Sequence, residues 1–211
     1  MPANAIIGVV GMRGHGKSTK MRETLHDRPH VLVVDTLAEH GGEGNNPGWT
    51  ETLKGSISQN INRILSGKWQ RVSVLLPVNE EEQQIAFLYY CRAVYACARK
   101  LKSDLTLVVE EIDWYSKPNW ENEGLKLIIQ YGRHGPVNLV WTARNIGSVS
   151  RKLTSETDMY VLFRVQEPIW LDAMRERLST EVAERVSELP EFHFLLTDKS
   201  GKILEEGITN P

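Results

Sequence analysis

The stretch "AIIGVVGMRGHGKST", residues 5–19, decides how the rest of the chain is interpreted. Its apolar first half predicts a short buried strand, and a helix is expected from Lys17 to about His26. Glycines at 11, 14 and 16 lie between the two elements. Glycine allows backbone conformations in which successive N–H groups turn inward and cradle an anion, and the positive end of the following helix adds to that attraction. The stretch therefore predicts a phosphate-binding loop.

The spacing of this loop fits the pattern G-x-x-x-x-G-K-[ST]. In that pattern the lysine, here Lys17, reaches the β and γ oxygens of a nucleotide, and the hydroxyl of Ser18 coordinates Mg²⁺. The alternative is a glycine-rich turn that happens to precede a lysine, but the strand before the loop and the helix after it favour the nucleotide. The predicted nucleotide-binding residues are Gly11, Met12, Arg13, Gly14, His15, Gly16, Lys17, Ser18 and Thr19.

Composition limits the class of protein. The chain has 211 residues, of which 41% are hydrophobic and 25% charged, with a formal net charge of −2. A globally basic protein is excluded, although a basic stripe on a neutral molecule can still bind nucleic acid. The two cysteines, Cys91 and Cys97, lack metal-ligand spacing and are interpreted as reduced, buried thiols. No apolar stretch approaches the length of a membrane span and the start does not resemble a signal peptide, so a cytoplasmic protein is expected.

Strand-like and helix-like segments alternate along the chain. Further strands are predicted at 30–36, 71–77, 105–113, 137–144 and 159–165, and helices at 80–101, 121–135 and 168–189, with a hairpin at 192–207. Residues 37–49 are rich in Gly, Asn and Pro and predict a long loop. Most strands are almost continuously apolar, which is typical of a parallel sheet covered on both faces. We therefore predict a three-layer α/β P-loop NTPase fold of the RecA/ASCE type, with a mostly parallel sheet and a short C-terminal hairpin. The whole chain, 1–211, is expected to form one domain, with its core at about 5–165 and a C-terminal helix and hairpin at about 168–207.

Two adjacent acids follow the apolar run in "LTLVVEEID". At the carboxyl end of a parallel strand they are expected to face the ligand site. We assign Glu110 to the Mg²⁺ shell and Glu111 to the polarisation of a water that attacks the γ-phosphate. The alternative is a strand that ends in solvated acids. The second acid favours hydrolysis over transfer to a small metabolite, and the chain has no N-K-x-D guanine motif. The predicted cofactors are therefore ATP and Mg²⁺.

The sequence also resembles a known family. "VVEEID" looks like the strand with two glutamates in FtsK/HerA-type P-loop motor ATPases, and "YGRHGPVNLVWTARN", 131–145, is similar to that family's helix end and following strand. "SRKLTSETDMYVLFRVQEP" resembles the next stretch. The resemblance runs from Ile6 to about Val165 and is strongest to the genome-packaging ATPases of membrane-containing, double-jelly-roll phages and viruses.

The resemblance implies roles for the residues around the second motif. Arg133 matches the arginine that family members present to a neighbouring subunit's nucleotide; the alternatives are a helix-terminal cation or a surface ion pair. Arg144 matches a strand-end arginine that relays the nucleotide state. The family usually has glutamine before that arginine as a sensor, whereas this chain has Ala143, so Thr142 and Asn145 are the candidates to replace it.

Family members also assemble as rings, usually hexamers, with the DNA through the centre. Such a ring needs basic or polar loops near its axis, and the candidates are "WYSKPNW", 114–120, and "RNIGSVSRK", 144–152. Lys117, Arg151 and Lys152 are the candidate phosphate contacts. Trp114 and Tyr115 either stack on DNA or pack in the core or an interface.

These inferences predict an ATP-driven translocase that pumps double-stranded DNA into a capsid. Its expected partners are double-stranded DNA, further copies of the same chain in a ring and the portal or vertex proteins of the capsid. Its expected location is the host cytoplasm during assembly, with association to the virion at the packaging vertex. One alternative is a Zot-like, nucleotide-dependent phage assembly or export protein, a class that normally carries a transmembrane segment. A small-molecule kinase is a weaker alternative, because "RKLTSETD" makes a poor arginine lid.

Overall fold

A computed structural model describes residues 4–36, 40 and 49–209. Its main sheet has nine strands in the order β11-β10-β9-β1-β8-β5-β2-β4-β3. The predicted class is confirmed: the fold is α/β, the sheet is mostly parallel, and an antiparallel hairpin closes the chain. Within the described residues, no helix combines the length and the apolar character needed to cross a bilayer.

Two compact units make up the described chain. The first contains residues 4–5, 25–110 and 121–139, and the second contains residues 6–24, 111–120 and 140–209. Strand β8 (Val137–Ala143) contributes residues to both units. The prediction of a single domain over 1–211 stays a prediction.

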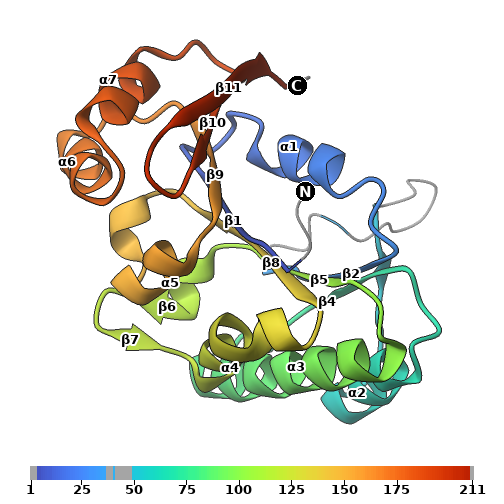
Figure 1. Ribbon diagram of the computed structural model, residues 1–211. Helices are drawn as coiled ribbons and strands as arrows, with labels where there is room; N and C mark the ends of the chain where they lie inside the picture. Colours follow the sequence, from blue (N-terminus) through green and yellow to red (C-terminus); the bar gives the residue numbers. More distant parts are fainter. Residues whose placement is uncertain (1–3, 37–39, 41–48, 210–211) are drawn as a thin grey trace. The chain divides into compact units, whose positions relative to one another are not determined.

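In the first unit, β2 (His30–Val34) pairs in parallel with β5 (Leu105–Val109) on one side and β4 (Arg71–Val74) on the other. The short β3 (Glu51–Thr52) adds to β4. Helix α3 (Glu80–Leu101) packs against α2 (Ile57–Ser66) and α4 (Glu123–Tyr131), and these helices lie together in Figure 1. Because every residue of β5 is buried, the apolar strand predicted there is confirmed.

In the second unit, β1 (Ile6–Val10) pairs in parallel with β9 (Met159–Phe163), and β9 pairs antiparallel with β10 (His193–Asp198). Strand β11 (Ile203–Ile208) completes the predicted hairpin. Helix α1 (Lys17–Thr24) follows β1, and α6 (Pro168–Arg177) packs on α7 (Thr180–Glu188) and on the 3₁₀ turn η3 (Ile146–Ser148). Strands β6 (Ser116–Lys117) and β7 (Trp120–Glu121) form a separate two-stranded ribbon.

Several predicted boundaries are wrong, each for a local reason. The helix predicted at 168–189 is two helices, because the Ser179 side chain accepts from the Val182 N–H and starts α7 as an N-cap. The strand predicted at 105–113 ends at Val109, since Glu111 has a left-handed backbone and η1 (Ile112–Trp114) follows. The predicted helix 121–135 gives way after Tyr131 to η2 (Gly132–His134).

The predicted loops are also more structured than expected. Residues 144–152 contain η3 and the first turn of α5 (Arg151–Glu156), and the strand predicted at 71–77 ends at Val74. Of the loop predicted at 37–49, only His40 and Trp49 lie within the described residues. Both cysteines are free and buried in α3, as predicted, and burial raises the pKa of each thiol.

Candidate nucleotide site

The glycine loop joins β1 to α1 within the second unit. Gly14 and Gly16 have φ of 82° and 96°, a left-handed region that side chains rarely adopt. The Gly11 N–H donates to the Ala143 carbonyl at 3.2 Å, so the loop is anchored on β8 where it leaves β1. The Lys17 Nζ donates to the Met12 carbonyl at 2.8 Å. This arrangement has the strand, glycine turn and helix start that phosphate binding requires.

The C-terminal segment packs against the same loop. A Cβ on Gly16 would lie 2.4 Å from the Thr209 methyl, so any side chain there would collide with this segment. Thr209 in turn donates from its hydroxyl to Glu23 at 3.3 Å, and the Lys20 ammonium lies 4.1 Å from the centre of the Phe194 ring. The C-terminal hairpin and the residue that follows it therefore pack against α1 and the glycine loop. The sequence did not suggest this role.

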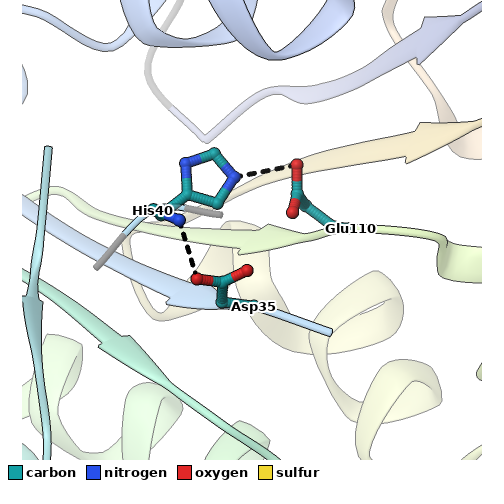
Figure 2. Close-up of side chains that lie close together, drawn as sticks. All are labelled: Asp35, His40 and Glu110. Carbon is teal, nitrogen blue, oxygen red and sulfur yellow. Dashed lines mark hydrogen bonds and ion pairs between the residues drawn. The ribbon is translucent and has the colours of Figure 1, made fainter. Parts of the chain in front are cut away.

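Glu110 follows β5 in the first unit and is only 4% exposed. Figure 2 shows its carboxylate facing the ring of His40, with 2.8 Å between Oε1 and Nε2. The backbone N–H of His40 donates to Asp35 Oδ2 at 2.9 Å, and Asp35 follows the end of β2. One ligand atom from each of the three residues lies within 4.8 Å of the others, and all three residues are buried.

Glu111 has a different environment in the second unit. Its backbone is left-handed, with φ 48° and ψ 56°, which is uncommon for a residue with a side chain. Its Oε1 accepts from Arg144 at 3.1 Å and its Oε2 accepts from the Trp114 indole at 3.4 Å. The N–H of Glu111 donates to the Thr142 hydroxyl at 3.1 Å. The carboxylate is therefore held at both oxygens.

A second acid lies close to this group. Asp113, in η1, has its pKa raised mainly by burial and in part by the charge of Glu111, while Arg144 and Lys117 act in the opposite direction. The site around Glu111 thus concentrates two carboxylates and two cations within one unit.

The structure brings some of the predicted residues together and leaves others apart. Thr142 and Arg144 both contact Glu111, which fits their candidacy as sensors. Asn145 instead caps η3, because its side chain accepts from the Gly147 N–H at 2.7 Å. Arg133 lies in η2, at the end of α4.

The predicted DNA contacts have varied surroundings. Lys117 is exposed in β6, and its Nζ lies 5.9 Å from the centre of the Trp120 ring. Arg151 pairs with Glu176 and thereby lowers the pKa of that carboxyl, while Lys152 occupies the next position of α5. Trp114 is 42% exposed, whereas Tyr115 is fully buried and belongs to the core.

The two residues assigned to magnesium, one in each unit, both supply oxygen donors. Ser18 offers a hydroxyl and Glu110 a carboxylate, and Mg²⁺ prefers such oxygen ligands.

The sequence analysis missed Asp35 and His40. Asp35 could have been found by the rule applied to Glu110, since it also follows a buried strand; no spacing signal links His40 to an acid 70 positions further along the chain.

The fold and the loop together define the class, a P-loop NTPase fold. The genome-packaging NTPase B204 of Sulfolobus turreted icosahedral virus 2, in complex with AMPPCP, superimposes with a TM-score of 0.79 at 18% identity, covering 99% of this chain and 98% of that one. B204 of Sulfolobus turreted icosahedral virus, described as a DNA-packaging ATPase, has a TM-score of 0.73 at 19% identity, covering 100% and 99%.

A more distant similarity extends to larger proteins. ATPases 2 and 3 of EssC from Geobacillus thermodenitrificans have a TM-score of 0.56 at 12% identity, covering 97% of this chain and 40% of that one. No protein-family model matches the chain, and no curated protein matches it significantly. The predicted resemblance is therefore confirmed at the level of the fold.

Proposed function

We propose that this chain is an ATPase that packages double-stranded DNA into a viral capsid. The observation that carries the proposal is the glycine loop, with left-handed glycines at 14 and 16 and a helix that begins at Lys17, in a chain with acids at the end of β5. The similarity of its fold to packaging NTPases over nearly the whole chain supports the same function.

In this proposal the loop N–H groups and Lys17 bind the triphosphate, and Ser18 and Glu110 hold Mg²⁺. An ion held there would supply positive charge that offsets the charge developing on the phosphate oxygens. Glu111 accepts a proton from the attacking water, as a general base. Arg133, supplied by the adjacent subunit, stabilises the transition-state charge.

Two contacts in the structure bear on a catalytic cycle. Lys17 donates to the Met12 carbonyl, and because an ammonium has three N–H groups it can donate to phosphate oxygens as well. Glu111 accepts from Arg144 and Trp114, one at each oxygen, and each oxygen has a second lone pair that can accept from water. Both partners of Glu111 are partly exposed, so exchanging them costs little.

DNA handling follows from the same proposal. A homo-oligomeric ring, expected from the family resemblance to be a hexamer, would present Lys117, Arg151 and Lys152 to phosphates of the double helix. Arg151 would then exchange Glu176 for a phosphate. The ring would act at a capsid vertex, in the host cytoplasm during assembly and in association with the virion.

The direct test is ATP hydrolysis with and without double-stranded DNA, together with light scattering after size-exclusion chromatography. We expect a ring whose hydrolysis DNA stimulates. Lys17→Ala should bind ATP more weakly and lose turnover while remaining folded, and undiminished hydrolysis by that variant would contradict the nucleotide site. Hydrolysis that DNA does not change would favour the export alternative. Transfer of the γ-phosphate to a metabolite would favour the kinase alternative.

A further inference from the structure

We infer that His40 is a positioning residue that orients the Glu110 carboxylate toward the metal. The inference rests on the proposed function, which gives Glu110 its role at the metal. Its basis is the direct contact of 2.8 Å between His40 Nε2 and Glu110 Oε1, with side chains only 0% and 6% exposed. The two atoms make an ion-pair contact and not an aligned hydrogen bond, since Nε2 has no hydrogen-bond partner among the described residues.

The backbone of His40 is fixed on both sides. Its N–H donates to Asp35 Oδ2 at 2.9 Å, and its carbonyl accepts from the Thr50 N–H at 3.1 Å. Asp35 is itself tied to the sheet, since its N–H donates to the Val74 carbonyl at 3.1 Å. The ring also meets the Trp49 ring edge-on at 5.9 Å between centres. Contacts at its N–H, its carbonyl and its ring thus restrain His40 beside Glu110.

Rigidity matters because a glutamate side chain rotates about three bonds. The backbone of Glu110 is fixed, since its N–H donates to the Val34 carbonyl at 3.3 Å and its carbonyl accepts from the Thr36 hydroxyl at 3.3 Å. A close contact at one carboxylate oxygen favours one side-chain orientation. Groups that hold a metal ligand in this way typically change metal affinity or activity by about 10–100-fold.

A cation held by Asp35, His40 and Glu110 themselves is the competing interpretation of this cluster. Such an ion would bind Nε2 through its lone pair and would be held by the three side chains without a nucleotide. The positioning role instead predicts that the metal binds together with the nucleotide.

The test compares His40→Leu, which removes the polar contact, with His40→Gln, whose amide can still contact the carboxylate. The measurement is the affinity for Mn²⁺ in the presence of AMPPCP, followed by electron paramagnetic resonance, alongside the affinity for AMPPCP in EDTA. We expect His40→Leu to weaken Mn²⁺ binding about 10–100-fold. His40→Gln should bind Mn²⁺ as the unmodified protein does, and metal-free nucleotide affinity should not change in either variant.

His30→Gln is the matched control. His30 lies in the same unit and its ring contacts a main-chain oxygen, that of Trp69 at 2.7 Å, rather than a carboxylate. The His30→Gln substitution should leave the affinity for Mn²⁺ unchanged. If His40→Leu fails to fold, Glu110→Gln is compared instead with the double variant that carries Glu110→Gln and His40→Leu. Neither of these proteins has the buried carboxylate charge at position 110. Without a carboxylate to orient, the two should bind Mn²⁺ equally.

The outcomes separate the inference from the proposed function. Unchanged Mn²⁺ affinity in His40→Leu, equal losses in Leu and Gln variants, or a further loss in the double variant would each overturn the positioning role. Mn²⁺ that binds without nucleotide and is lost in both His40 variants would instead indicate a cation site in the cluster. Protein that binds Mn²⁺ and AMPPCP but never hydrolyses ATP would contradict the proposed function and leave the inference intact.

Discussion

Glu110 and Glu111 are adjacent in the chain and have opposite surroundings. Glu110 is buried, and the histidine that holds it is fully enclosed. Glu111 is held by Arg144, whose side chain is 56% exposed, and by Trp114, which is 42% exposed. An enclosed partner keeps its carboxylate in one place, whereas exposed partners can exchange with solvent or with a ligand. The comparison indicates that the first glutamate is suited to hold an ion and the second to exchange its partners.

The largest expected effect concerns a group that neither glutamate can replace. Arg133→Ala should bind ATP but lose about 10³-fold or more in turnover, because an arginine supplied across an interface stabilises the transition state. Mixing inactive Arg133→Ala with inactive Lys17→Ala subunits should restore part of the activity, since some interfaces then pair an intact loop with an intact arginine. Mixed assemblies that never recover activity would mean that Arg133 acts within its own subunit or only in the fold.

The second prediction concerns stability. His40→Leu leaves a buried carboxylate without its histidine and should lower the free energy of unfolding by about 3 kcal/mol. Arg144→Met removes a partner whose side chain is 56% exposed and should cost about 0–1 kcal/mol. Chemical denaturation of both variants measures the difference. Equal losses would remove the contrast between an enclosed and an exposed partner.

The third prediction separates the chemistry of the two acids. Glu111→Gln keeps size and polarity but cannot accept a proton, so it should bind Mg-ATP normally and hydrolyse it at least about 100-fold more slowly. Glu110→Gln should instead require more Mg²⁺. Both are measured by ATPase titrations with Mg²⁺ and by nucleotide binding. If Glu110→Gln is the variant with normal binding and no turnover, the two assignments must be exchanged.

The smallest expected effect is a pH dependence beside Glu111. Burial raises the pKa of Asp113 above its usual value in the folded protein. Its contribution to stability is therefore fully present below the pKa of the unfolded chain, about 3.9, and is lost as pH rises through the folded pKa. Asp113→Asn should gain stability relative to the unmodified protein between about pH 3.5 and pH 7. Chemical denaturation of both proteins at both pH values measures this gain, and an equal stability difference at the two pH values would contradict it.

Much of the fold could be predicted because its signals are local. Helix α3 has exactly the predicted bounds, 80–101, since acids occupy its first turn and Arg99 and Lys100 its last. Helix α2 was missed, although its signals are present: Ser56 and Gln59 form a capping box and Gly67 ends the helix. The two-residue strands of the 116–121 ribbon carry too little pattern to be found in advance.

The candidate site likewise has one part with a local sequence signal and one part without such a signal. The glycine loop is a continuous motif, so the sequence predicts its position and its left-handed glycines together. The partners of the two glutamates come from distant parts of the chain, His40 for one and Arg144 for the other. Arg144 was named only through the family resemblance, and its contact with Glu111 depends on how β8 and β5 end. Such pairings are set by tertiary structure and leave no local pattern.

The left-handed backbone of Glu111 has a consequence for protein engineering. A residue with a side chain at φ 48° costs about 1 kcal/mol or more relative to glycine. A selection for thermal tolerance alone should therefore enrich Glu111→Gly, which relaxes the backbone and deletes the carboxylate in one step. With Glu111 as the proposed general base, screens for robust variants of this chain would then accumulate inactive ones at this position, unless hydrolysis is selected at the same time.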